Sequence, residues 1–397
     1  MRQERNNIFV GIDWILIILF IILVCFGWMN IYAASKADED FQLLNFSTKY
    51  GKQAVFIFLT VPLIVTVLFF NAKFYEQFAS LFYIISLLSL IGLFVFGKEI
   101  NGAKSWYNFG VLGLQPSEFV KAFTALAVAK LLSDRQYNLK LIKNQIKAFV
   151  IIFTPALLIT LQPDAGSALI YLAFFFVLNR EGLTLNYLII GTIAIFIFIF
   201  SILLGPTLIL AILLGLTTLI VTYITYKSGK RFLRFNWLKI FGLYAVMSLF
   251  IFGTNFSYNN IFKQHHRDRF EILLGLKTDT KTIGYNSYQS ELTISSGGFS
   301  GKGFLNGDIT KGDFVPEQHT DYIFSTVGEE WGFLGSSLVI ITFILMLFRI
   351  IYLADTHTNK FGRIYGYGVA SILFFHVIVN IGMVIGLLPT VGIPLPF

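Results

Sequence analysis

Long apolar runs separated by short polar segments make up most of this chain. A helix needs about 20 apolar residues to cross the hydrocarbon core of a membrane, and runs of roughly that length recur along the whole sequence. The pattern predicts an all-α fold, a polytopic membrane helical bundle. We expect eleven spans, some of them short, near residues 13–35, 53–71, 76–97, 117–133, 147–162, 166–180, 187–204, 206–226, 238–254, 333–354 and 364–388.

A long polar region follows the ninth of these runs. Residues 255–320 combine an amphipathic stretch, FKQHHRDRFEILLGL, with a glycine-rich one, SSGGFSGKGFLNG, and we expect a large external loop there. Residues 206–254, just before it, have the pattern of a self-contained transmembrane hairpin, two apolar runs around the basic KSGKRFLRFNWLK. Because no Pro/Gly/Ser linker or internal repeat divides the chain, we expect residues 1–397 to form one integral membrane domain.

Composition and charge agree with a membrane protein. Hydrophobic residues make up 56% of the chain and charged residues 13%, and the mean hydropathy is +0.72, outside the range of soluble globular proteins. The net charge of +8 would suggest nucleic-acid binding in a soluble protein. With a cytoplasmic N-terminus, however, fifteen Lys and Arg fall in cytoplasmic segments and five in the short external loops 36–52 and 98–116. Membrane topology therefore explains the charge, and we expect no nucleic-acid partner.

The sequence does not predict a disulfide or a metal centre. Cys25 is the single cysteine, so no intrachain disulfide can form. His265 and His266 are adjacent rather than at ligand spacing, and we predict no metal cluster, while leaving a requirement for a divalent cation open. The acidic DED at 38–40 resembles a metal-binding motif of nucleotide-sugar enzymes, but it lies on the external face, away from nucleotides, and we expect a solvated loop.

The polar cluster PEQHTDYIF, residues 316–324, runs directly into an apolar segment. It places Asp321 at the junction of the longest polar loop with a membrane helix. A carboxylate at the edge of a medium that penalises its charge has a readily raised pKa, and it can act as a base on a molecule arriving at the membrane surface. The alternative is that Asp321 caps the N-terminus of the helix that follows.

Three other charged residues interrupt the apolar bundle. In QPSEFVK, Glu118 and Lys121 are three residues apart and share one helical face, as either a structural ion pair or a ligand site. In LQPDAGSALIY, Pro163 ends one apolar run and Asp164 stands at the N-cap position of the next helix, with Ser167 three residues on. Capping is the simpler role for Asp164, although a helix N-terminus near the external side also suits an anionic group.

Two loops carry weaker signals. Trp106, in NGAKSWYNFG, belongs either to an interfacial aromatic belt or to a site where a ring stacks on a sugar. The glycines around Lys302 either make tight turns or let backbone amides approach a phosphate. That stretch is not a Walker A loop, because Gly303 follows Lys302 where Ser or Thr is required.

Taken together, these segments resemble the SEDS family (shape, elongation, division and sporulation), membrane glycosyltransferases that polymerise peptidoglycan. The DW opening of the first helix and the PEQHTDYIFSTVGEEWG stretch are most similar to the elongation members, and the division members are the nearest alternative. The matching stretches span almost the whole chain: DWILIILFIILVCFGWMNIYAAS, NGAKSWYNFGVLGLQPSEFVK, LQPDAGSALIY, YNSYQSELTISSGGFSGKGFLNG, FVPEQHTDYIFSTVGEEWGFLG and GLLPTVGIPLPF.

The resemblance implies roles for particular residues. Asp321 would be the essential catalytic carboxylate residue. We expect it to act as the base on the acceptor hydroxyl. Glu118 and Lys121 would be a functional pair, Trp106 would lie at the external site, and Asp164 would belong to the PDxG motif. Cations should stabilise the polyprenyl diphosphate leaving group. The candidates, in order of preference, are Lys121, Arg267, Arg269 and Lys302, and His319 is a further substrate-binding candidate.

The resemblance also implies partners and a location. The substrates would be lipid II and the growing glycan chain, and the partners a class B penicillin-binding protein, a single-span transpeptidase, with other membrane proteins of the elongation complex. The protein would lie in the bacterial inner membrane with its active site outside. The family has about ten helices, so the hairpin 206–254 would be an added pair. Members continue past the position of Phe397 with a last helix, which we therefore expect to be missing here.

Two other classes of function fit the same features. A flippase or exporter of a lipid-linked precursor would also have a broken helix and paired interior charges. Such transporters typically show inverted repeats, which are not evident in this sequence, and their key charges lie at the midplane rather than at a loop–helix junction. A scaffold that recruits a partner is the third class, although no residue identifies its docking face.

Overall fold

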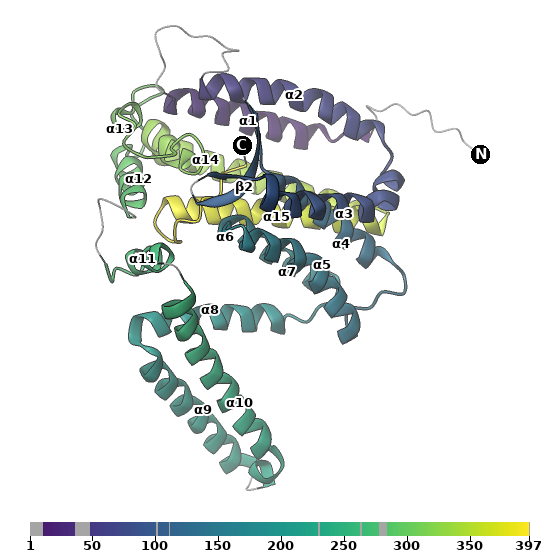
Figure 1. Cartoon of the computed structure of the whole chain (residues 1–397), viewed down its shortest axis with the longest axis vertical. Coiled ribbons are helices and arrows are strands. Elements are labelled where there is room, and N and C mark those ends of the chain that lie inside the picture. The colour runs from purple at the N-terminus through teal and green to yellow at the C-terminus, as the bar shows by residue number, and fades with distance from the viewer. Residues whose placement is uncertain are drawn as a thin grey trace, which may run out of the picture. The chain divides into compact units, whose positions relative to one another are not determined.

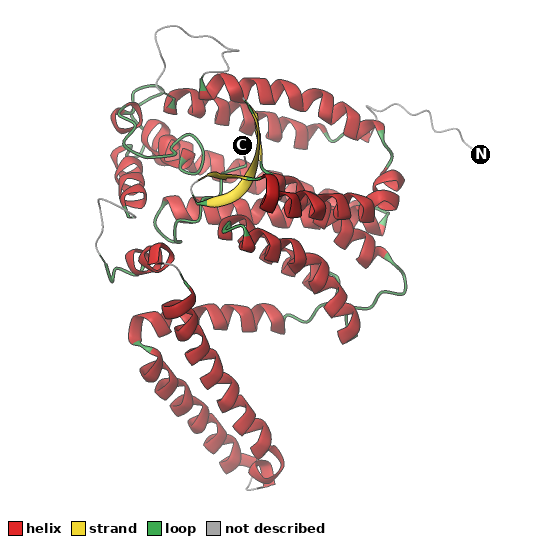
Figure 2. Ribbon diagram, in the orientation of Figure 1, coloured by secondary structure: helices red, strands yellow, loops and turns green. Residues whose placement is uncertain are grey.

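Helices dominate the computed structural model of the chain (Figures 1 and 2). The chain divides into two compact units, which are described separately. The first comprises Met1–Leu183 and Asn286–Phe397, and the second comprises Thr184–Tyr285. The structure describes residues 11–35, 48–100, 102–110, 112–228, 231–262, 264–277 and 284–396.

Among the described residues, nine helices are long and apolar enough to cross a membrane. The prediction of a polytopic helical bundle is therefore confirmed. The two other expected spans correspond to α4 (Pro116–Ser133) and to the short apolar stretch Ala165–Arg180. In α4, Glu118, Lys121 and Lys130 lower the apolar content of a helix that is otherwise long enough to cross.

The first unit is organised around α15 (Lys360–Val384). This helix packs against α14 (Ile323–Thr356), α4, α7 and the 3₁₀ turn η2, and α14 packs in turn on α1 (Figure 1). The other helices of the unit are α1 (Trp14–Ala34), α2 (Lys49–Phe69), α3 (Ala72–Phe96), α5 (Ile142–Leu161), α6 (Ala165–Leu169), η2 (Ile170–Ala173), α7 (Phe174–Arg180), α12 (Tyr285–Ser296), whose first residue belongs to the second unit, and α13 (Asp308–Lys311).

A small antiparallel sheet occupies the segment 98–116, where the sequence predicted only a loop. Gly102 and Gly110, with φ of 83° and 80°, lie in its two turns, where residues with side chains are disfavoured. The hydroxyl of Tyr107 donates to the Ser89 carbonyl of α3 at 2.8 Å, which fixes the sheet against the bundle. Its strands, in the order β1-β2-β3, are β1 (Lys98–Ile100), β2 (Ala103–Phe109) and β3 (Leu112–Leu114).

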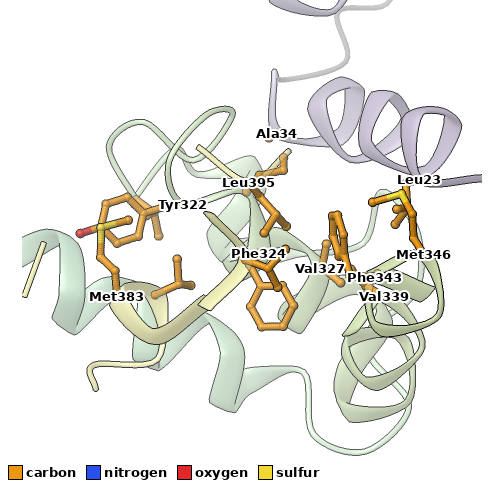
Figure 3. Packing of buried hydrophobic residues seen from close by; sticks show 14 residues of the cluster. Leu23, Ala34, Tyr322, Phe324, Val327, Val339, Phe343, Met346, Met383 and Leu395 are labelled. Atoms are coloured by element: carbon orange, nitrogen blue, oxygen red, sulfur yellow. The ribbon is translucent and has the colours of Figure 1, made fainter. Parts of the chain in front are cut away.

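Buried apolar side chains from α1, α14, α15 and the segment after α15 form one cluster (Figure 3). Leu23 and Ala34 come from α1, and Phe343 of α14 is fully buried. Leu395 belongs to the same cluster, so the segment after α15 packs into the apolar core of the unit. This core lies directly beside the junction that carries Asp321, because Tyr322 is one of its members.

Helix α14 begins at Ile323, directly after the loop–helix junction that the sequence predicted at Asp321, and its later part contains the apolar span expected at 333–354. The helix is interrupted at Gly332. The φ of 63° and ψ of −160° at Gly332 are accessible almost only to glycine. The glycine-rich loop (residues 297–303) supplies the hydrogen bonds that the interruption leaves open on both sides. These bonds run from Lys302 N to Glu329 O (3.0 Å), Gly303 N to Glu330 O (2.9 Å), Phe333 N to Gly298 O (3.0 Å) and Leu334 N to Phe299 O (3.1 Å).

The second unit contains the residues expected to form the hairpin. Its helices α9 and α10 pack on one another and both pack on α8. Beyond α10, the Lys277 ammonium pairs with the buried Asp268 carboxylate at 2.8 Å. The elements are α8 (Asn186–Leu204), α9 (Pro206–Ser228), α10 (Arg231–Phe256), the π-helical turn η3 (Ser257–Ile261) and α11 (Gln264–Leu273).

Candidate functional site

Asp321 lies in the turn that leads into α14, and its side chain is half-buried. The capping role considered for it is wrong, because Tyr322 is the N-cap and no side chain caps this helix; the Tyr322 amide donates instead to the Glu317 carbonyl at 3.2 Å. Within the described part of the chain the Asp321 carboxylate has no hydrogen-bond donor. Burial, and after it the charges of Glu317 and Asp164, raise the pKa of the Asp321 carboxyl to about 6.

Asp164 caps α6, as the sequence predicted. Its Oδ1 accepts the Ser167 amide at 3.0 Å, and its Oδ2 accepts the Ser167 hydroxyl at 2.9 Å. The side-chain amide of Gln115, just before α4, donates to the same Oδ2 at 3.1 Å. The Asp164 charge also interacts with the Lys121 ammonium and with the Asp321 carboxylate.

Glu118 and Lys121 form the predicted ion pair on α4. The Lys121 ammonium is 2.8 Å from both carboxylate oxygens of Glu118. The two side chains differ in exposure, because that of Lys121 is 3% exposed and that of Glu118 is 40% exposed. The buried ammonium also lies 2.6 Å from Nε2 of His376 on α15, a contact that the sequence did not predict.

An extended segment after α15, which we call the strap (residues 389–396), passes beside the helix capped by Asp164 and beside the Asp321 carboxylate. Its Val391 carbonyl approaches Gly166 so closely that a Cβ on Gly166 would lie 2.3 Å from the carbonyl oxygen. Gly392 has φ of 67°, and a Cβ there would lie 3.2 Å from Oδ2 of Asp321. The strap therefore links the helix capped by Asp164 with the turn that carries Asp321, and both contacts depend on glycine.

Three other predicted residues lie on the first unit. Trp106 is on β2, with its ring against Gly113 of β3, where a Cβ would lie 3.1 Å from Cε3. His319 Nδ1 is 3.0 Å from the Lys49 ammonium, and burial, followed by the Lys49 charge, lowers the His319 pKa. The Lys302 ammonium is held by the carboxylates of Glu329, at 2.8 Å, and Asp308, at 3.3 Å.

The remaining predicted residues lie in the second unit or outside the described residues. Arg267 and Arg269 lie on α11 in the second unit, where the Arg267 guanidinium donates to the Gln264 side chain at 2.7 Å. The DED at 38–40 and the side chains of His265 and His266 lie outside the described residues. Among those that are described, no three His, Cys, Asp or Glu side chains are arranged to hold a metal ion.

Comparison with known proteins places this geometry in context. The family model FtsW/RodA/SpoVE, described as cell cycle protein, matches residues 13–203 and 179–397, almost the whole chain. The chain belongs to this family. The FtsW/RodA/SpoVE model covers every predicted site residue of the first unit, and it also covers Arg267 and Arg269 of the second.

Relatives within the FtsW/RodA/SpoVE family match over nearly their full length. Peptidoglycan glycosyltransferase MrdB of Escherichia coli K12 is 30% identical, over 98% of this chain and 88% of the relative. Peptidoglycan glycosyltransferase RodA of Treponema pallidum is 29% identical, over 96% and 92%. A solved structure described as structural coordination of polymerization and crosslinking by a peptidoglycan synthase complex matches with a TM-score of 0.68 and 26% identity, over 98% of this chain and 91% of that chain.

Two buried polar residues beside the candidate site escaped the sequence analysis. His376 and Asn380 stand four residues apart in the apolar helix α15, and they are 5% and 0% exposed. Both are polar groups inside a membrane span, which is itself a signal of function or of obligatory hydrogen bonding. Their partners lie on α4, on the strap and in the turn before α14, so spacing along the chain could not pair them.

Proposed function

We propose that this FtsW/RodA/SpoVE family member is a peptidoglycan glycosyltransferase that polymerises lipid II into glycan strands during cell elongation and shape maintenance. Two relatives that match almost end to end, MrdB and RodA, are named peptidoglycan glycosyltransferases. The observation that carries the proposal is the carboxylate of Asp321, half-buried, without a hydrogen-bond donor among the described residues, and with its pKa raised to about 6. A carboxylate in that state is a competent base near neutral pH.

The chemistry requires one base and a stabilised leaving group. The acceptor hydroxyl oxygen forms a bond to the anomeric carbon of the donor sugar, and its proton passes to the Asp321 carboxylate. The bond from that carbon to the diphosphate oxygen breaks, and its electron pair leaves with the polyprenyl diphosphate. Because the diphosphate is already a stable anion, it needs cationic stabilisation rather than protonation. One carboxylate with a nearby cation therefore suffices, unlike the pair of carboxylates in a glycosidase.

We favour Lys121 as the cation. Its ammonium and the Asp321 carboxylate both interact with the charge of Asp164. Lys302 is a weaker candidate, because two carboxylates already hold its ammonium and their hydrogen bonds and charges raise its pKa. We assign Glu118 to the partner of Lys121, and we assign Trp106, Asp164 and His319 to substrate binding. The assignment of Arg267 and Arg269, which lie in the second unit, to substrate binding stays a separate prediction.

A transpeptidase partner and an inner-membrane location complete the proposal. The solved relative that coordinates polymerization with crosslinking supports a class B penicillin-binding protein as partner. The excess of Lys and Arg in alternate loops supports a cytoplasmic N-terminus. In that orientation Asp321 and the sheet between α3 and α4 both face the outside, where lipid-linked precursors are presented.

Polymerisation of purified lipid II tests the proposal. Wild-type protein, with the transpeptidase partner present, should form glycan chains, and Asp321→Ala and Asp321→Asn should lower the rate by about 10²-fold or more. Asp134→Asn is the matched control, because it removes an exposed carboxylate at the C-terminal end of α4. This variant should polymerise normally. Normal polymerisation by a folded Asp321→Ala variant would rule out the base, and transfer of lipid II across vesicles without polymer would favour the flippase.

A further inference from the structure

Helix α15 presents two buried polar side chains on one face. His376 and Asn380 are four residues apart, so they lie one above the other. Each is nearly inaccessible to solvent, with exposures of 5% and 0%. A buried polar group in a membrane span is costly unless it is hydrogen-bonded, so the partners of these two side chains indicate what they are for.

His376 joins a cation to the strap. Its Nε2 lies 2.6 Å from the Lys121 ammonium and its Nδ1 lies 3.3 Å from the Pro394 carbonyl oxygen. An ammonium can only donate and a carbonyl can only accept. One state of the ring satisfies both contacts, the neutral imidazole with its proton on Nδ1, which accepts from Lys121 and donates to Pro394. A doubly protonated ring would set an N–H group against the ammonium.

Asn380 makes the corresponding link to the turn before α14. Its Nδ2 donates to the main-chain carbonyl of Asp321 and to that of Ile393, both at 2.7 Å. Both hydrogens of the amide group are therefore used. Ile393 precedes Pro394 in the strap. The side chains of His376 and Asn380 therefore hydrogen-bond to adjacent carbonyls of the strap.

We propose that His376 and Asn380 are positioning residues that set the Lys121 ammonium and the Asp321 carboxylate relative to one another. The two charged residues are 200 positions apart in the chain, Lys121 on α4 and Asp321 in the turn before α14. The strap and the α15 face give them a common support. The inference rests on the proposed function, in which both act in one step, and small displacements of reacting groups can cost about 10²-fold in rate.

The choice of substitutions separates positioning from packing. His376→Phe keeps a ring of similar size but removes both hydrogen bonds. His376→Gln keeps an acceptor for Lys121 and a donor for the strap in a group that does not titrate. His357→Phe, in the loop between α14 and α15, is the matched control, because that histidine is exposed. His376→Met replaces His376→Phe if the phenylalanine variant does not fold.

Steady-state polymerisation of lipid II by the purified full chain with its partner is the first measurement. His376→Phe should lower kcat by about 10–10²-fold with little change in KM, while His376→Gln stays within a few-fold of wild type. In a Lys121→Met background, His376→Phe should cause no further loss, because it acts through Lys121. An undiminished kcat in a folded His376→Phe variant, failure of Gln to rescue, or additive losses would each overturn the proposal.

Nitrogen NMR of protein labelled with ¹⁵N at its five histidines tests the contact independently of activity. The signal of His376, assigned by its absence from His376→Gln, should report the tautomer protonated on Nδ1, and it should change in Lys121→Met. A proton on Nε2 in the wild type would refute the contact. Wild-type protein that polymerises nothing but shows the expected tautomer would reject the proposed function and leave the link between Lys121 and the strap standing.

Discussion

The Lys302 ammonium lies 2.8 Å from a carboxylate oxygen of Glu329, and the Glu329 side chain has no exposed surface. That carboxylate also accepts the Ile309 and Thr310 amides at 3.0 and 2.8 Å and the Thr310 hydroxyl at 2.7 Å. It therefore holds the first turn of α13 and the end of the glycine-rich loop against α14. These contacts give Lys302 a structural role, beside the weaker candidacy for substrate binding that remains a prediction.

The Glu329 contacts predict an unequal effect of removing the two partners. Glu329→Leu leaves several buried donors unsatisfied and should destabilise the protein by about 3–5 kcal/mol. Lys302→Met leaves Glu329 its backbone donors and should cost about 1–3 kcal/mol. Thermal unfolding in detergent measures both, with Lys311→Met, an exposed lysine at the end of α13, as the control. Equal losses for the two variants would contradict this reading of the cluster.

The raised pKa of Asp321 predicts opposite pH trends for activity and stability. The base is active when deprotonated, so kcat/KM should rise with pH through about 6 and level off above it. The folded protein prefers the protonated carboxyl, so the stabilising contribution of Asp321 is complete below the ordinary value of 3.8 and is lost as the pH rises through about 6.

Two measurements check these trends. A pH–rate profile of lipid II polymerisation should show the acidic limb, and thermal unfolding from pH 4 to 7 should show that Asp321→Asn removes part of the pH dependence of stability. A wild-type profile that stays flat between about pH 5 and 7 would argue against Asp321 as the titrating base.

The unequal burial of Glu118 and Lys121 predicts different outcomes for their substitution. Lys121→Met removes a buried charge and leaves Glu118 partly exposed to solvent, so the fold should tolerate it while polymerisation falls by about 10²–10³-fold. Glu118→Gln leaves the 3% exposed ammonium without its counter-ion and should lower the unfolding temperature more than Lys121→Met does. Thermal unfolding and polymerisation assays, run side by side on both variants, separate the two effects.

Gly332 predicts a stability effect that depends on the backbone. Gly332→Ala forces a side chain into a conformation that only glycine adopts readily, and its Cβ would lie 2.3 Å from the Gly301 amide nitrogen. We expect a loss of about 3 kcal/mol or more. Gly191→Ala in α8 is the control, because a Cβ there meets nothing within 4 Å and alanine favours helix. A Gly332→Ala protein with wild-type thermal stability would show that the break in α14 is not required.

Apolar periodicity predicted the membrane helices well because lipid requires long apolar segments with internal hydrogen bonding. The expected span 187–204 coincides closely with α8 (Asn186–Leu204). The helix start beside Asp321 was predicted from the junction of polar and apolar residues, and α14 begins at Ile323. The break at Gly332 was not predicted, because the glycine-rich loop that satisfies the Glu329 carboxylate and the carbonyls at the break is distant in sequence, and spacing does not reveal that contact.

The candidate site was predictable only where the interacting residues are close in sequence. Local pairs were found from spacing, as with Glu118 and Lys121 on one helical face. The sheet was missed although the Asn-Gly at 101–102 is a strong hairpin signal between two short runs. His376 was missed because its partners, Lys121 and a strap carbonyl, are distant in sequence or belong to the main chain.

At the break in α14, the backbone of the glycine-rich loop replaces the hydrogen-bond partners that the helix itself would otherwise provide. If the loop peeled away, the carbonyls and amides on both sides of Gly332 would lose their partners in a span where water cannot replace them cheaply. Hydrogen bonds therefore hold the loop and the two halves of α14 together. We expect any opening that admits a lipid-linked sugar beside Asp321 to come from elements outside this assembly.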